Sequence, residues 1–230
     1  MKKSVILFFI AVCILPATAQ DAIFTAPDYK QIEKNVRDST SPFYYPSLLE
    51  RYLAADSTLN TEERRHVYFG YVYQPKYTPA DTSQYNNLLA EVLSSQSLHP
   101  DDYPKILSYA DALLVEDPFN LRALKAKLLV YAQQNNVADY KKAAHQKKIV
   151  QDAIVSTGDG MSEKTPFYVI RVSHEYDLLP FLGFSFGGDD KVIKNGNYLT
   201  LGSNRFGVER VYFDISPVMQ YVNRHGGGKL

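Results

Sequence analysis

Tryptophan is absent from the sequence, and cysteine occurs only once, as Cys13. Because Cys13 lies in an N-terminal segment that we expect to be cleaved, the remaining chain has no thiol. Disulfides, thiolate zinc sites and cysteine nucleophiles are therefore excluded, so the folded protein depends on its core for stability. The lack of tryptophan disfavours a carbohydrate-stacking platform, whereas 18 tyrosines and 12 phenylalanines supply enough aromatic side chains for a core.

The chain also lacks an excess of charge of one sign, since 25 Lys and Arg residues balance 25 Asp and Glu residues. We therefore expect neither nucleic acid nor an anionic membrane surface as a partner. The sequence contains no phosphate-binding glycine loop, no G-x-S-x-G nucleophile elbow and no pair of histidines at zinc-ligand spacing. These absences predict a protein without a cofactor.

The first 19 residues have the three parts of a secretory signal peptide. Lys2 and Lys3 are followed by the apolar run 4–15 and by the small residues 17–19, so the mature chain is predicted to start at Gln20. The apolar run is shorter than the roughly 20 residues that a membrane span requires, which predicts no stable membrane anchor. We expect a periplasmic or secreted protein; an uncleaved anchor and a buried N-terminal helix are the alternatives.

Residues 20–160 show helical periodicity. Asn60 and Glu63 form a capping-box pattern, which predicts the start of a helix. Residues 102–134 resemble a tetratricopeptide-type helix pair, because the turn 117–120 (Asp-Pro-Phe-Asn) separates two amphipathic stretches. An irregular helical bundle with a common helix-turn-helix is the alternative.

Residues 161–223 change to β-branched and aromatic runs. We expect a strand over 167–172, a loop at 187–190, and a hairpin formed by 198–201 and 208–215. The sequence thus predicts an α+β fold, with an N-terminal helical layer followed by a C-terminal antiparallel sheet or meander packed on the helices. Residues 224–230, which are rich in glycine, are predicted to form a flexible tail.

Two groups of polar residues in the β-rich half are candidates for chemistry. His174 and Glu175 place a base beside a carboxylate after a predicted strand, where they would serve proton transfer in a hydrolase. Neighbouring residues of a strand point to opposite faces, so solvation of a strand end is the alternative. Asp189 and Asp190 follow two glycines and would bind a divalent cation, although the other oxygen ligands of a calcium loop are missing.

An aromatic run around 68–73 covers every side of a predicted helix. Its candidate binding residues are Tyr68, Phe69, Tyr71 and Tyr73. Such a run indicates either burial between helical neighbours or an exposed patch for a partner.

Several short motifs are spread over most of the chain. They are Tyr44-Tyr45-Pro46-x-Leu48, Arg51-Tyr52, Glu63 with Tyr68-Phe69-Gly70-Tyr71, Phe167-Tyr168-Val169-Ile170, His174-Glu175-Tyr176-Asp177 and Val211-Tyr212-Phe213-Asp214-Ile215. With the signal peptide, this set resembles an uncharacterised family, a domain of unknown function, of exported proteins from Gram-negative bacteria. The resemblance implies that the whole chain is one unit, and it implies no activity.

Three functions remain open from the sequence. We favour a non-enzymatic envelope protein that binds another envelope protein or a peptide. The alternatives are a hydrolase with a site near His174 and Glu175, and a small-ligand-binding protein that uses the concave side of the sheet.

Overall fold

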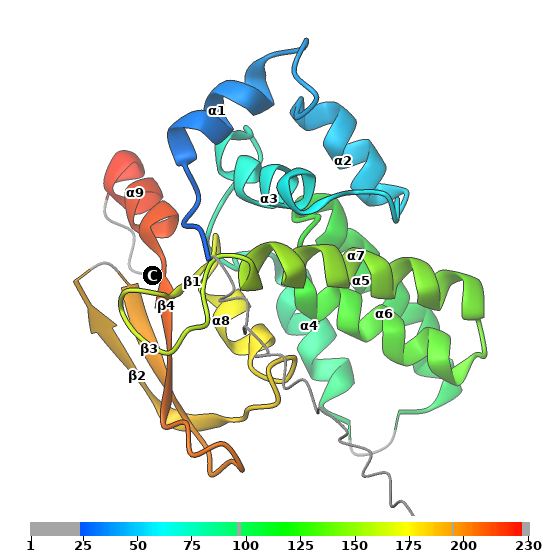
Figure 1. The fold of residues 1–230 in the computed structure, drawn as a ribbon. Coiled ribbons are helices and arrows are strands. Elements are labelled where there is room, and N and C mark those ends of the chain that lie inside the picture. Colours follow the sequence, from blue (N-terminus) through cyan, green and yellow to red (C-terminus); the bar gives the residue numbers. More distant parts are fainter. Residues whose placement is uncertain (1–23, 96–97, 195, 227–230) are drawn as a thin grey trace, which may run out of the picture.

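The computed structural model describes residues 24–95, 98–194 and 196–226, and it has the α+β layout that the sequence predicts (Figure 1). The predicted signal peptide lies outside these described residues. The α-helices are α1 (Tyr29–Arg37), α2 (Tyr45–Leu53), α3 (Thr61–Phe69), α4 (Gln84–Leu93), α5 (Tyr103–Glu116), α6 (Leu121–Gln133), α7 (Val137–Val155), α8 (Ser173–Leu178) and α9 (Ser216–His225). The short 3₁₀ helices are η1 (Gly70–Tyr73) and η2 (Pro100–Asp102), and the strands are β1 (Phe167–Tyr168), β2 (Phe186–Ile193), β3 (Gly196–Leu201) and β4 (Arg210–Asp214).

Helices α1 to α3 and η1 form the upper part of the molecule in Figure 1. The predicted capping box at the start of α3 is confirmed, since Asn60 Oδ1 accepts from the Glu63 amide at 3.0 Å and Glu63 Oε2 accepts from the Asn60 amide at 2.8 Å. These bonds satisfy two amides that would otherwise lack a partner in the first turn. They fix where α3 begins, and thereby place its aromatic C-terminal half.

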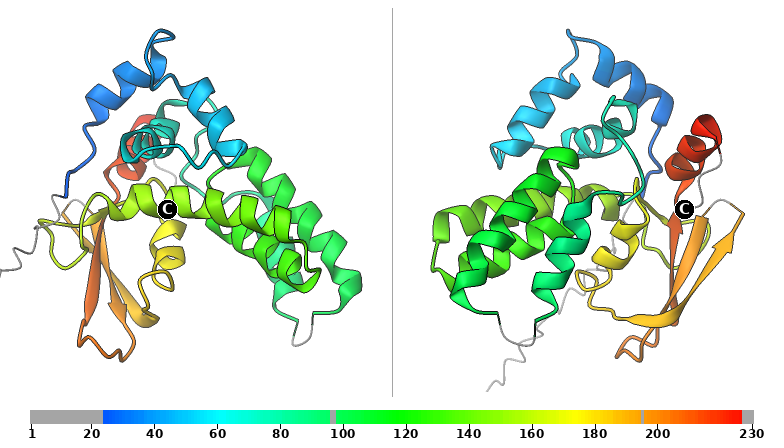
Figure 2. Two further views of the ribbon diagram at one scale, coloured as in Figure 1. Left: turned by 45° about the vertical axis from the view of Figure 1, so that its right-hand side comes forward. Right: turned by 180° about the vertical axis from the view of Figure 1, so that it is seen from behind.

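Helices α4 to α7 pack in consecutive pairs and form one arm of the molecule, while the sheet forms the other (Figure 2). Asn120 begins α6 by accepting a hydrogen bond from the Ala123 amide at 2.9 Å. The turn from α5 to α6 therefore lies where the Asp-Pro-Phe-Asn motif predicts it, whereas the tetratricopeptide resemblance stays a prediction. Within the described residues, we find no helix with both the length and the apolar character needed to cross a bilayer.

The four strands form one sheet in the order β1-β4-β3-β2. Strands β2, β3 and β4 pair antiparallel, which confirms the predicted hairpin of β3 and β4, but β1 pairs parallel with β4. The sheet is thus mixed rather than purely antiparallel. Residues 187–190, predicted to be a loop, belong to the exposed edge strand β2: residues 187–189 form an irregularity in its pairing with β3, and regular pairing resumes at Asp190.

The segment after β1 also differs from the sequence prediction. Only two residues of the predicted strand 167–172 pair as β1, and the chain then turns into the short helix α8. Helix α9 closes the fold beside α1 (Figure 1) and continues through Arg224 and His225, the first residues of the predicted tail, while 227–230 lie outside the described residues.

The main core joins the helices to the sheet. Its buried members come from α1 to α3, α6 to α8, the sheet and α9, and include Tyr52, Phe119, Ile154, Phe213 and Val218. A smaller core lies between α4, α5 and α6. Because apolar side chains of β1, β3 and β4 are buried in the main core, the helical and β-rich regions share one interior.

Candidate functional site

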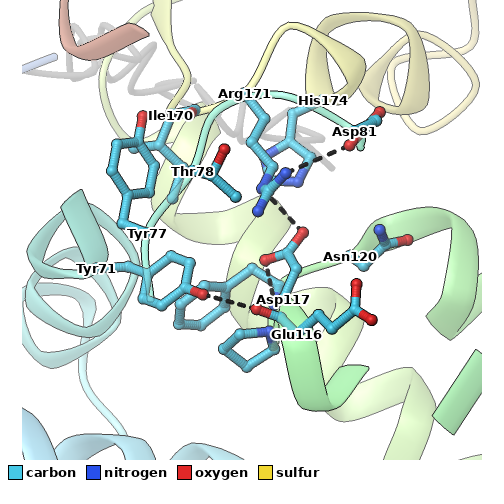
Figure 3. Close-up of polar contacts among 12 residues, drawn as sticks. Tyr71, Tyr77, Thr78, Asp81, Glu116, Asp117, Asn120, Ile170, Arg171 and His174 are labelled. Atoms are coloured by element: carbon cyan, nitrogen blue, oxygen red, sulfur yellow. Dashed lines mark hydrogen bonds and ion pairs between the residues drawn. The ribbon is translucent and has the colours of Figure 1, made fainter. Parts of the chain in front are cut away.

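A buried arginine joins three segments at the junction of the helices and the sheet (Figure 3). Arg171, only 3 % exposed, lies between β1 and α8. Its Nε atom lies 2.9 Å from Asp117 Oδ2 in the α5–α6 turn, and its Nη1 atom lies 3.3 Å from Asp81 Oδ1 in the linker before α4. We call Arg171 with Asp81 and Asp117 the clasp. Its buried charges are compensated only while the three segments are packed together, so it has a structural role.

The electrostatics of Asp117 follow from its burial. Burial raises the pKa of Asp117 to about 6, and the charge of Arg171 acts in the opposite direction. Its Oδ1 atom accepts the Phe119 amide at 3.2 Å, which tightens the turn. The cavity beside this clasp measures about 30 Å³, room for one or two water molecules and too small for a substrate.

His174, the predicted base, lies on α8 inside the core and is 1 % exposed. The Tyr68 hydroxyl accepts the Ile170 amide at 3.3 Å and is hydrogen-bonded to His174 Nδ1 at 2.7 Å. Burial and, secondly, the charge of Arg171 lower the pKa of His174 to about 3, while the Phe119 backbone acts in the opposite direction. The ring is therefore neutral at physiological pH and is held by a hydroxyl rather than by a carboxylate.

Glu175, the predicted partner of this base, points toward the sheet. Its side chain is fully buried, and its Oε2 atom accepts a hydrogen bond from Asn197 Nδ2 on β3 at 2.6 Å. Burial raises the pKa of Glu175 to about 8, so the carboxyl is protonated at neutral pH. His174 and Glu175 thus have different partners, and neither is among the residues that line the cavity beside Arg171. A hydrolase site at this pair stays a prediction.

The predicted cation ligands lie elsewhere. Asp189 and Asp190 are exposed on the edge strand β2, and Asp190 Oδ2 accepts a hydrogen bond from the Tyr176 hydroxyl at 3.0 Å. In the part of the chain that the structure describes, no three or more His, Cys, Asp or Glu side chains are grouped so that they would hold a metal ion.

The aromatic run does not form an exposed patch. Tyr68, Phe69 and Tyr71 are buried in the main core, and the Tyr71 hydroxyl donates to the Glu116 carbonyl at 3.0 Å. The run is therefore buried between helical neighbours, as in the first of the two interpretations of the sequence. Tyr73 alone is partly exposed, and it faces a groove.

This groove lies between α1, the segment 72–77 and α9, and its volume is about 310 Å³. Its walls are mostly aromatic, polar or charged; they are lined by Tyr29, Glu33, Arg37, Val72, Tyr73, Gln74, Pro75, Tyr77, Pro217, Gln220, Tyr221, Arg224 and His225. We call it the α1–α9 groove. Helices α1 and α9, which line this groove, are far apart in sequence and lie beside each other only in the fold (Figure 1).

Some charged side chains of the α1–α9 groove form ion pairs, and one does not. Glu33 forms an ion pair with Arg37 at 2.8 Å, and the Arg37 guanidinium carbon lies 5.9 Å from the centre of the Tyr73 ring. Arg224, on the opposite wall, makes no ion pair with a described residue. Burial and, secondly, the charge of Glu33 raise the pKa of Tyr73 to about 12, while the charges of Arg224 and Arg37 act in the opposite direction.

Sequence reasoning missed the α1–α9 groove. Glu33 and Arg37 are spaced as an ordinary helical i, i+4 pair, and Arg224 lies in the predicted tail. The only hint was Tyr73, which belonged to the predicted interaction surface. Nothing in the local pattern indicates that α9 packs beside α1.

A comparison with known families matches residues 30–224 to a domain of unknown function (DUF4919), so the chain belongs to this family. The match spans helices and sheet together, and it assigns no activity. No curated protein and no solved structure matches the chain.

Proposed function

We propose that the protein is an exported, non-enzymatic interaction module that binds a peptide or another envelope protein in the α1–α9 groove. The observation that carries this proposal is an open groove with tyrosines on both walls and a guanidinium, that of Arg224, without an ion-pair partner among the described residues. Tyrosine and arginine supply large contact areas and strong hydrogen bonds at protein interfaces.

The alternatives have less support from the geometry. The titratable groups with strongly shifted pKa values, His174 and Glu175, are closed inside the core. A small-ligand function would use the same groove, whose volume of about 310 Å³ lies near the lower limit for ligand pockets. The groove is lined by side chains of two helices and of the segment 72–77, an arrangement that suits an extended peptide segment.

Site-specific photo-crosslinking tests the interaction role. A photoreactive amino acid replaces Gln220, which is exposed and lines the groove, and in a control it replaces Gln84, exposed at the start of α4. We expect a discrete adduct with one envelope protein or peptide from position 220 and none from position 84. Equal labelling from both positions, or no adduct from position 220, would contradict the proposal.

Export is tested separately on the same cells. We expect the protein in the periplasmic or secreted fraction, with Gln20 as its N-terminal residue by mass spectrometry. A cytoplasmic protein that retains residues 1–19 would contradict the export part of the proposal and leave the binding part standing.

A further inference from the structure

The charge and the ring surfaces of the α1–α9 groove indicate what it binds. We infer that its occupant is an acidic extended peptide, in which a carboxylate pairs with Arg224 while a neighbouring proline or aromatic residue lies on the tyrosines. This inference rests on the proposed function and adds the chemical class of the partner.

Three fully charged residues, Glu33, Arg37 and Arg224, line the groove. Glu33 and Arg37 neutralise one another within α1, at 2.8 Å. Arg224 then remains as a positive charge on the α9 wall that no described carboxylate compensates. The groove therefore has a net positive character, and a guanidinium prefers a carboxylate, which it binds through two parallel hydrogen bonds.

His225 lines the groove beside Arg224. Its Nδ1 atom lies 3.0 Å from the Tyr221 carbonyl, and its ring stacks on the Tyr221 ring with centroids 4.1 Å apart. Both contacts hold the imidazole at the C-terminal end of α9. A basic ligand would meet the charge of Arg224 in this groove, so the arrangement disfavours it.

Tyr73 and Tyr221 lie on opposite walls of the groove. The Tyr73 hydroxyl donates to the Tyr29 carbonyl at 2.8 Å, and Tyr221 packs edge-on against Tyr77 at 5.5 Å. Both rings are thus fixed before any ligand arrives, so binding costs little side-chain entropy. Fixed aromatic walls of this kind accept proline and aromatic side chains of an extended peptide.

Fluorescence anisotropy with three synthetic probes tests the inference. The probes are fluorescein-labelled hexapeptides with a central Pro-Tyr, flanked on each side by two glutamates, two glutamines or two lysines, and each is made with an amidated C-terminus. A fourth probe, the glutamine peptide with a free C-terminus, distinguishes a terminal carboxylate from side-chain carboxylates as the recognised group.

We expect the mature protein to bind the glutamate probe at least about tenfold more tightly than the glutamine probe, and the lysine probe most weakly. Arg224→Glu removes this preference and improves binding of the lysine probe. The control Arg205→Glu makes the same charge change on the exposed loop between β3 and β4 and leaves the preference intact. The glutamate preference weakens with added salt because a partly exposed ion pair is screened.

Equal affinity for the three charge types, no binding of any probe, or indifference to Arg224→Glu would overturn the inference. If the glutamine peptide with a free C-terminus binds more strongly than the glutamate probe, the group recognised by Arg224 is a terminal carboxylate. That result would contradict the inference that the occupant is an acidic peptide. The proposed function fails separately: if position 220 crosslinks to a partner while no acidic probe binds, the interaction role stands and only the occupant is wrong.

Discussion

The buried junction around Arg171 and the α1–α9 groove contain similar residue types, but these residues differ in exposure and in ion pairing. At the junction, the arginine meets two carboxylates, and the histidine and glutamate beside it have strongly shifted pKa values but no opening. In the groove, Arg224 and Tyr73 are accessible, and the arginine has no described ion-pair partner. The largest cause of the shifted pKa values of His174 and Glu175 is burial, whereas the charge of Arg224 is exposed at the groove.

The largest expected effect tests the junction. Arg171→Met leaves Asp117, 4 % exposed, without its compensating charge. We expect the free energy of unfolding to fall by about 3–5 kcal/mol, measured by urea denaturation. The control Arg64→Met costs about 1 kcal/mol or less, because its partner Asp152 keeps the ion pair with Lys148 at 2.7 Å.

A second variant separates loss of the charge pair from loss of packing. Adding Asp117→Asn to Arg171→Met removes the orphaned charge, so a substantial part of the stability returns. If the double variant is as unstable as the single one, the clasp contributes through packing and not through charge.

The next effect concerns the pH dependence of stability. Glu175 has a pKa near 4.5 when exposed and about 8 in the folded protein, so the folded state holds its proton more tightly. Its contribution is fully present below pH 4.5 and is lost as the pH rises toward 8. Glu175→Gln removes this loss, and between pH 5 and 7.5 the variant gains on the order of 2 kcal/mol relative to wild type.

Denaturation at several pH values measures this difference. The exposed residue Glu209 supplies the control Glu209→Gln, for which we expect parallel stability curves. A Glu175→Gln curve that is also parallel to wild type would mean that Glu175 is ionised in the folded protein.

A smaller effect tests the hydroxyl that holds His174. Tyr68→Phe deprives the Ile170 amide of its acceptor and His174 Nδ1 of its hydrogen-bond partner, inside the core. We expect a loss of about 1–2 kcal/mol. Tyr52→Phe is a matched control, since that hydroxyl makes a single bond, to the Pro118 carbonyl at 2.8 Å, and should cost less. Equal losses would argue against a shared role for the Tyr68 hydroxyl.

The smallest effect on stability belongs to the groove. Arg224→Glu changes an exposed side chain outside the core, so the free energy of unfolding should move by no more than about 0.5 kcal/mol. A melting curve checks this result. If the free energy of unfolding instead falls as much as it does for Arg171→Met, Arg224 is a structural residue, and the two regions do not differ in the way described.

Local sequence patterns predicted the helices and the hairpin well, because their signals are local. The capping box of Asn60 and Glu63, the turn before Asn120 and the pairing of β3 with β4 are all present. Edge strand β2 was missed, since Gly187, Gly188 and Asp189 lie in an irregularity of its pairing with β3, and Asp190 pairs with Leu199 only because β3 lies beside it. Strand β1 is parallel to β4 and brief because the chain turns to bring Arg171 to Asp117.

The functional residues were less predictable for the same reason. His174 and Glu175 have the residue types of a catalytic pair, but α8 directs them to Tyr68 and Asn197. The α1–α9 groove depends on packing between the two ends of the chain, which no short motif encodes.

The most direct test of the central claim is a map of backbone amide chemical shifts during titration with the glutamate probe. We expect the changes to be confined to residues 29–37, 70–77 and 216–225, which form the α1–α9 groove, and to be absent from the same titration of Arg224→Glu. Changes centred on α8 and its neighbours, around His174 and Glu175, would contradict the account and place the binding site at the junction.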